Sequence, residues 1–269
     1  MSGALLWAVA ALWGAAAGGM LPRAAYRFTV PAGEPWRDRC PRGHALQGWL
    51  GPARCGECAR AGAPLPEPPQ APPAALTPAP ASTPALISPQ PPSAVLLATT
   101  TALLCGVLAA ATGARPELVV WLLLAPVGVL LAVIDLQVRR LPDPLTLPLA
   151  ATALALLGLA ALLPEHAGHW LTAVYGALAL GASYLVLFLI NPAGMGFGDV
   201  KLAVGMGAVL GWYGWPTLLL GTFAGFLLGA LYGGALVVVR RAGRKTAIAF
   251  GPFLIAGAFL GLLAGAYGA

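Results

Sequence analysis

Long apolar runs separated by short polar segments make up most of the chain. A helix needs about 20 apolar residues to cross a bilayer, and eight runs are candidates by this measure. Val200–Trp212 is the shortest of them and the weakest candidate. The eight expected spans are Ala4–Leu21, Val95–Ala111, Leu118–Ile134, Pro144–Leu163, Leu171–Ile190, Val200–Trp212, Trp215–Val239 and Thr246–Tyr267.

The composition leads to the same class of protein. Of the 269 residues, 59% are hydrophobic and only 9% are charged, whereas soluble domains carry about 25% charged residues. We therefore expect an all-α polytopic membrane protein, with about eight transmembrane helices in the lipid bilayer. The net charge is +6, but the basic residues are scattered over short loops between apolar spans. We therefore expect no nucleic-acid partner.

Two polar stretches interrupt the apolar pattern. Residues 22–60 carry ten of the 24 charged residues of the chain, and residues 61–94 are rich in Pro, Ala and Ser. Proline fixes φ and removes backbone donors, so the second stretch is expected to be extended. The expected organisation is a first transmembrane helix at 1–21, a cytoplasmic Cys/His segment at 22–60, a Pro/Ala-rich linker at 61–94 and a membrane domain of seven helices at 95–269.

The cations predict the orientation of the chain. With eight spans, alternating loops place fourteen of the fifteen Lys and Arg residues on one side and only Arg115 on the other. Cytoplasmic loops carry the excess of cations, so we expect that side to be the cytoplasm and both termini to lie outside. The fourteen are Arg23, Arg27, Arg37, Arg39, Arg42, Arg54, Arg60, Arg139, Arg140, Lys201, Arg240, Arg241, Arg244 and Lys245.

Three acids, Asp135, Asp143 and Asp199, stand at the cytoplasmic ends of expected spans, whereas Glu117 and Glu165 are expected in outer loops. Two spans separate Asp135 from Asp199, so the chain returns to the same face and packing could bring both acids together. Two carboxylates held close cannot both ionise, so one keeps a proton. Such a pair suits aspartic proteolysis, in which one acid takes a proton from water and the other donates to the amide carbonyl.

Alternating glycines precede the last of these acids, in "GMGFGD". Gly194, Gly196 and Gly198 lack side chains, which permits unusual φ/ψ values and close approach of a substrate strand. Irregular backbone at membrane depth is tolerated where it lines a cavity. The glycines do not fit a phosphate-binding loop, because no strand precedes them and no GK[ST] follows.

Three motifs together resemble those of the bacterial type IV prepilin peptidases (leader peptidases), which are GxGD-type membrane aspartic proteases. "GMGFGDVKL" is similar to the GxGD signature, and "AVIDLQVRRLPDPLTLPL" is similar to the family's other acidic motif. "AIAFGPFLIAG", from Ala247, is similar to its Phe-Gly-Pro-Phe run in the last span. The resemblance covers about Val95 to the C-terminus, with the motifs in the family's order.

The resemblance implies that Asp135 and Asp199 are the catalytic pair of a multi-pass enzyme in the bacterial inner membrane, with its active site facing the cytoplasm. It implies prepilin or pseudopilin precursors as substrates, cleaved after a glycine. Many members also methylate the new N-terminus with S-adenosylmethionine, and methylation is a weaker expectation here.

Further roles are expected for residues beside the two acids. Gly196 and Gly198 would line the substrate groove, and Lys201 would lie near Asp199 and tune its charge. Asp143 is interpreted as the N-cap of a helix that begins near Pro144. Arg139 and Arg140 are interpreted as membrane anchors.

Plainer interpretations stay open. Asp135 could pair with Arg139, and Asp199 with Lys201 or a lipid headgroup, as acids at helix ends often do. A proton-coupled transporter would also use membrane carboxylates, although we find no second copy of either acidic motif. An inert scaffold for a secretion machine is the third alternative.

The polar segment contains "CPRGHALQGWLGPARCGEC", which spaces Cys40, His44, Cys55 and Cys58 like the ligands of a closed tetrahedral zinc site. The family's segment carries two Cys-x2-Cys pairs. Here Gly43 stands at the fourth position and His44 follows it. The alternative is a loop of reduced cysteines; if zinc binds, we expect a structural role. Cys105 is expected to be a packing residue.

Overall fold

The computed structural model describes residues 3–31, 33–40, 42–53, 55–60, 93–192, 194–239 and 249–269. Within these ranges the chain forms nine α-helices and no strand, apart from an isolated bridge between Arg39 and Ala45. The helices are α1 (Gly3–Phe28), α2 (Gly56–Arg60), α3 (Ala94–Thr112), α4 (Glu117–Val138), α5 (Asp143–Ala160), α6 (Trp170–Ile190), α7 (Phe197–Gly211), α8 (Trp215–Val238) and α9 (Gly251–Gly268).

Some of the sequence predictions fall outside the described residues. They include most of the linker expected at 61–94 and the start of the last motif at Ala247. Five of the counted cations also lie outside: Arg54, Arg240, Arg241, Arg244 and Lys245.

Seven of the described helices are long and apolar enough to cross a membrane, judged by length and composition. They confirm the prediction of an all-α, multi-pass membrane protein. The eighth expected span corresponds to α7, which has only 15 residues. At about 1.5 Å per residue it covers roughly 22 Å of a hydrocarbon core about 30 Å thick. α7 is mostly buried and packs against α5, α6, α8 and α9, so protein rather than lipid surrounds it.

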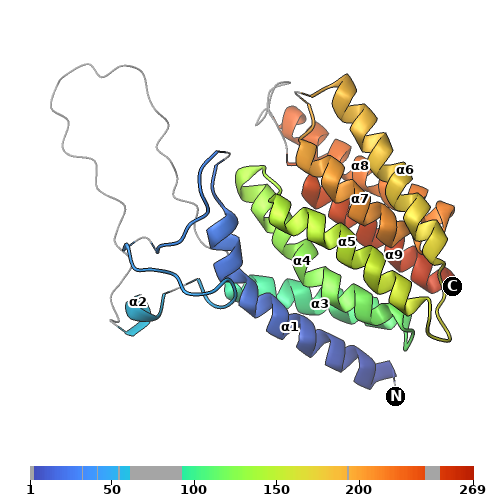
Figure 1. Ribbon diagram of the computed structural model, residues 1–269, viewed down its shortest axis with the longest axis horizontal. Coiled ribbons are helices and arrows are strands. Elements are labelled where there is room, and N and C mark those ends of the chain that lie inside the picture. The colour runs from blue at the N-terminus through green and yellow to red at the C-terminus, as the bar shows by residue number, and fades with distance from the viewer. Residues whose placement is uncertain are drawn as a thin grey trace.

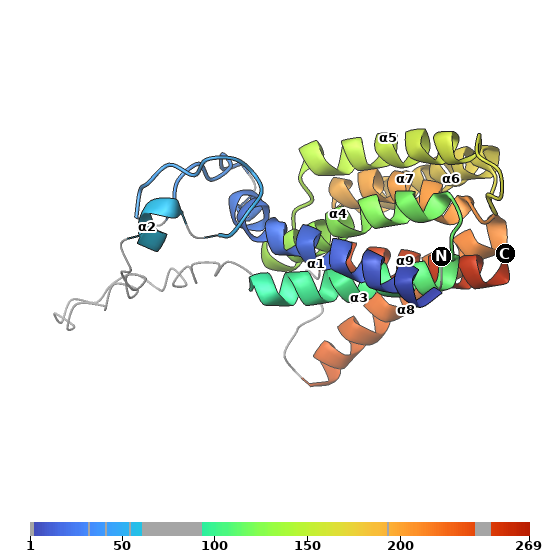
Figure 2. The same cartoon turned by 90° about the horizontal axis from the view of Figure 1, so that it is seen from below.

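The helices form one bundle whose two ends differ in what they carry. Figures 1 and 2 show the N- and C-termini at the same end, with α2 and the Cys/His segment beyond the opposite end. An even number of passes produces this arrangement, because each helix reverses the direction of the chain.

Pro22 lies inside α1, where a proline has no N–H group to donate and bends the helix. α1 changes direction near its C-terminal end (Figure 1). Around the bend, the backbone pairs with the polar segment: Gly51 N–H donates to the Met20 carbonyl (2.7 Å), and Arg23 N–H donates to the Gly51 carbonyl (3.0 Å). The polar segment is therefore held against the last turns of α1, which end at Phe28 rather than at Leu21.

Small residues let the membrane helices approach closely. An added Cβ at Gly14 of α1 would lie 2.5 Å from the carbonyl oxygen of Thr101 on α3. One at Gly176 of α6 would lie 2.5 Å from the carbonyl oxygen of Gly207 on α7. Glycine-mediated packing of this kind is typical of membrane bundles. It sets the position of α7, the helix that carries Asp199.

Glu117 is placed differently from the expectation of an outer loop. It is the first residue of α4 and is fully buried. Its Oε1 accepts hydrogen bonds from the Tyr213 hydroxyl (3.4 Å) and the Ala167 N–H group (3.3 Å). Burying a carboxylate costs less where donors reach it, and here both donors reach Oε1, whereas Oε2 has no partner among the described residues. Glu117 thus joins α4 to the connections that precede α6 and α8, at the end of the bundle where the termini lie.

We expect Glu117→Ala to lower the free energy of unfolding by about 1–3 kcal/mol, because it leaves the Tyr213 hydroxyl and the Ala167 N–H group without an acceptor. Glu117→Gln is the matched control, since its amide oxygen can still accept. Denaturant unfolding in detergent measures both variants. Equal stability of the two would contradict this role of Glu117.

Candidate active site and candidate metal centre

Asp135 lies near the C-terminal end of α4, and 4% of its surface is exposed. Its Oδ2 accepts a hydrogen bond from the backbone N–H group of Gly251, at 2.9 Å. Gly251 begins α9, so the carboxylate also lies at the positive end of a helix dipole. An added Cβ at Gly251 would lie 2.7 Å from the same oxygen. The Phe-Gly-Pro-Phe motif therefore supplies a donor to Asp135, and its glycine lets the carboxylate lie close to the backbone.

Asp199 lies in the first turn of α7 and is also buried. Its N–H group donates to the carbonyl of Gly196, at 3.0 Å. An added Cβ at Gly196 would lie 3.5 Å from Asp199 Oδ2, and one at Gly198 would lie 2.9 Å from Leu141 Cβ. Gly198 thus admits the close approach of Leu141, whereas the approach of a substrate strand stays a prediction. The expectation of unusual backbone angles is wrong: Gly194, Gly196 and Gly198 are not among the described glycines with positive φ.

The fold brings the two acidic motifs together. Leu141, in the connection between α4 and α5, packs on Gly198 beside Asp199. Asp135 and Asp199 lie near enough to interact electrostatically. Neither acid makes an ion pair among the described residues: the pairing of Asp199 with Lys201 is not formed, and Arg139 interacts with Asp135 only at longer range. The arrangement places two buried carboxylates and a glycine-rich backbone at one end of the bundle.

Asp143 and Lys201 are placed differently from their expected roles. Pro142, not Asp143, is the N-cap of α5, and no side chain caps that helix end. Asp143 instead pairs with Lys201 Nζ, at 2.7 Å, and joins the first turns of α5 and α7. The Asp143 side chain is 59% exposed, so the pair contributes no more than about 1 kcal/mol.

Tyr184 of α6 is a residue of the site that the sequence reasoning missed. It is buried, its hydroxyl has no hydrogen-bond partner in the described part of the chain, and it lies within electrostatic range of Asp199. Its ring centroid lies 5.7 Å from that of Phe226 and 6.3 Å from that of Phe250. The run before Asn191 also contains the hydroxyl groups of Thr172, Tyr175 and Ser183, so nothing in the sequence singled out Tyr184.

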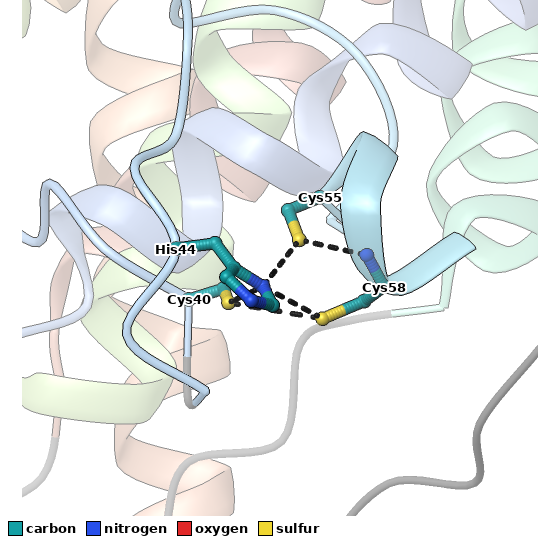
Figure 3. Close-up of side chains that lie close together, drawn as sticks. All are labelled: Cys40, His44, Cys55 and Cys58. Carbon is teal, nitrogen blue, oxygen red and sulfur yellow. Dashed lines mark hydrogen bonds between the residues drawn. The ribbon is translucent and has the colours of Figure 1, made fainter. Parts of the chain in front are cut away.

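The Cys/His segment forms a separate cluster. One ligand atom each from Cys40, His44, Cys55 and Cys58 lies within 4.8 Å of the others. Figure 3 shows the three sulfur atoms around the imidazole of His44. His44 Nδ1 lies 3.7, 3.5 and 3.4 Å from the sulfur atoms of Cys40, Cys55 and Cys58. These four residues could hold a metal ion.

The spacing of these atoms fits a tetrahedral ion. Bonds of about 2.0–2.3 Å separate tetrahedral ligands by about 3.4–3.8 Å, and Cys40 and Cys58 have their sulfur atoms 3.9 Å apart. Gly43 explains why His44 is the fourth residue: Gly43 has φ +84° and closes a turn on the Cys40 carbonyl (2.8 Å). His44 Nε2 lies 3.5 Å from Glu57, a carboxylate placed to orient the ring.

The cysteines of the cluster also contact one another. The N–H group of Cys58 donates to Cys55 Sγ (3.2 Å) and lowers the pKa of the Cys55 thiol. The hydrogen bond between the two thiols raises the pKa of Cys58 to about 11. A bound cation would replace the thiol protons. Cys105, in contrast, is buried in α3 away from the cluster.

Comparison with known proteins bears on the membrane part of the chain. Residues 118–234 match the type IV leader peptidase family. The resemblance that the motifs predicted is therefore confirmed. Both Asp135 and Asp199 lie within the matched residues.

Curated relatives carry the name prepilin leader peptidase/N-methyltransferase. The chain is 39% identical to the one from Aeromonas salmonicida (strain A449) over 152 residues, which are 54% of this chain and 48% of that protein. It is 40% identical to the Aeromonas hydrophila protein over 154 residues (54% and 49%), and 36% identical to the Escherichia coli (strain K12) protein over 139 residues (49% and 57%). The chain spans about half the length of the curated relatives it matches. No solved structure matches it significantly.

We expect the purified protein to carry one metal ion per chain and Cys55→Ser to lose it, because three ligands bind far less tightly than a closed set of four. Cys105→Ser is the matched control and should keep the ion. Elemental mass spectrometry after gel filtration measures both. Equal metal content in the two variants would show that the cluster is not the binding site.

Proposed function

We propose that the protein is a prepilin-type leader peptidase. It would be an aspartic endopeptidase that removes the leader from type IV pilin or pseudopilin precursors at the cytoplasmic face of the bacterial inner membrane. The observation that carries the proposal is the placement of Asp135 and Asp199. Two acids from separate motifs are both buried and in electrostatic contact beside a glycine-rich backbone.

The chemistry assigned to the pair follows from their sharing one proton. The ionised carboxylate accepts a proton from a water molecule, whose oxygen attacks the scissile carbonyl carbon. The protonated carboxyl group donates to the carbonyl oxygen. The carboxylate of Asp135 is the better candidate for the ionised partner, because the Gly251 N–H group and the α9 dipole both favour negative charge.

The cytoplasmic orientation has two supports. The Cys/His segment lies beyond the same end of the bundle as the connection after Asp135, since Arg140 of that connection donates to the Pro31 carbonyl. That segment also carries many of the cations that predict the inner side. The relatives' printed name supports peptidase activity and gives no support to the transporter alternative.

We infer that zinc is the metal of the Cys/His cluster, with a structural role. Three thiolates and an imidazole are the donors that zinc prefers, and four protein ligands leave no position open for a reactive water. The residues at 22–60 would then form a small metal-ordered segment that precedes a linker and the membrane peptidase domain.

Methyl transfer from S-adenosylmethionine to the new N-terminus stays a prediction. Its support is the word N-methyltransferase in the relatives' name. Transfer of a labelled methyl group to a cleaved pilin peptide would test it separately from cleavage.

We expect Asp135→Asn and Asp199→Asn each to lower the rate of leader cleavage by at least about 10³-fold, because either change removes half of the proton exchange. Asp143→Asn is the matched control: it removes an exposed carboxylate from the same region and should cost no more than about fivefold. Cleavage is measured on a purified prepilin-like substrate with correctly inserted variants. Full activity in either dyad variant would end the assignment.

A further inference from the structure

The Cys/His segment contacts the connection that follows Asp135 through one pair of side chains. The guanidinium carbon of Arg140 lies 4.4 Å from the ring centroid of Trp36, a cation–π contact. Arg140 Nη1 also donates to the carbonyl oxygen of Pro31, at 3.0 Å. Trp36 and Pro31 belong to the chain between α1 and the cysteine cluster, whereas Arg140 belongs to the connection between α4 and α5.

The contact is one edge of an aromatic stack. The buried ring of Phe28, the last residue of α1, meets Trp36 edge to face (centroids 5.0 Å apart) and stacks on Trp49 (4.8 Å). On the far side, Arg27 lies 4.0 Å from the Trp49 ring. Arg140 therefore closes a stack whose other members all come from α1 and the Cys/His segment.

The stack is joined to the candidate metal cluster by the backbone. Arg37 N–H donates to the Arg27 carbonyl at 3.1 Å, and Cys40 N–H donates to the His44 carbonyl at 2.9 Å. Residues 36–49 thus run from one aromatic ring to the other through two of the candidate ligands. A metal that fixes those ligands also fixes the ends of this stretch.

On its other side, the same connection reaches the acidic motifs. Arg139 is the left-handed C-cap of α4, and its N–H group donates to the carbonyl of Asp135 itself, at 2.8 Å. Leu141 is buried against Gly198, next to Asp199. Residues 139–141 therefore touch the Cys/His segment through Arg140 and both acidic motifs through its two neighbours.

We propose that Arg140 and Trp36 are positioning residues that couple the Cys/His segment to the dyad. Metal bound by the cluster orders the segment, the segment holds Arg140, and Arg140 holds the turn that places Asp135 and Gly198. The metal then supports cleavage without contacting the substrate. Only the cleavage assay below rests on the proposed function; the hydrogen-exchange experiment does not.

Hydrogen exchange of the full chain in detergent tests the coupling without any activity. In the wild type, we expect removal of the metal by a chelator to speed exchange in residues 136–145 about two- to tenfold, the range that one cation–π contact supports. Adding zinc back should restore the protection. Arg140→Ala should show the faster exchange already with metal bound, and the chelator should add little.

Two variants distinguish positioning from general damage. Arg140→Lys keeps a cation over Trp36 and should recover part of the protection. Arg115→Ala removes an arginine at the opposite end of the bundle, where it bonds to the Ala266 carbonyl, and should leave residues 136–145 unchanged. In the cleavage assay, Arg140→Ala should lower kcat by about two- to tenfold and leave KM unchanged.

The proposal is overturned if the protein takes up no metal, or if chelation exposes residues 37–58 while exchange at 136–145 stays the same. It is also overturned if removing the metal lowers the rate of leader cleavage by the same factor in the wild type and in Arg140→Ala. Complete lack of cleavage in the wild type, with the exchange coupling intact, would contradict the peptidase assignment and leave the coupling standing.

Discussion

The hydrogen bond from the Gly251 N–H group to Asp135 is the contact on which the candidate active site depends. A carboxylate buried at the end of a membrane bundle needs a donor, and here the donor is the first residue of another helix. A side chain at residue 251 would displace the accepting carboxylate, because a Cβ there would lie 2.7 Å from its oxygen. Phe250, the residue before Gly251, packs against Tyr184 of α6. Helices α4, α6 and α9 therefore meet near Asp135 and Asp199.

Glycine is used here for proximity. Gly198 lets Leu141 approach the backbone beside Asp199, as Gly251 lets Asp135 approach α9. The two acidic motifs are thereby held through backbone and apolar contacts, and through the Asp143–Lys201 ion pair, which includes neither Asp135 nor Asp199. Lys201, which would otherwise be a candidate partner for Asp199, is engaged by Asp143. The arrangement leaves Asp135 and Asp199 outside the ion pairs formed among the described residues.

Much of this could be predicted from the sequence. Apolar runs predicted the helices, because length and hydropathy decide what crosses a bilayer, and the spacing of Cys40, His44, Cys55 and Cys58 predicted the cluster. The roles of Gly251 and Tyr184 could not be predicted, because they depend on which helices pack together. The cap assigned to Asp143 failed for the same reason: a tertiary partner, Lys201, outweighed the local one. The burial of Glu117 could not be predicted either, because its partner Tyr213 is distant in the sequence.

The claim that Asp135 and Asp199 act as one unit can be tested by binding alone. A prepilin-like peptide whose scissile amide is replaced by a tetrahedral hydroxyl-bearing isostere mimics the transition state. The wild type should bind it at least about 100-fold more tightly than the matching amide peptide, measured with a slow-cleaving sequence. We expect that preference to disappear when either acid is changed to asparagine. Retention of the full preference in one of these variants would mean that the two carboxylates do not share the reacting centre.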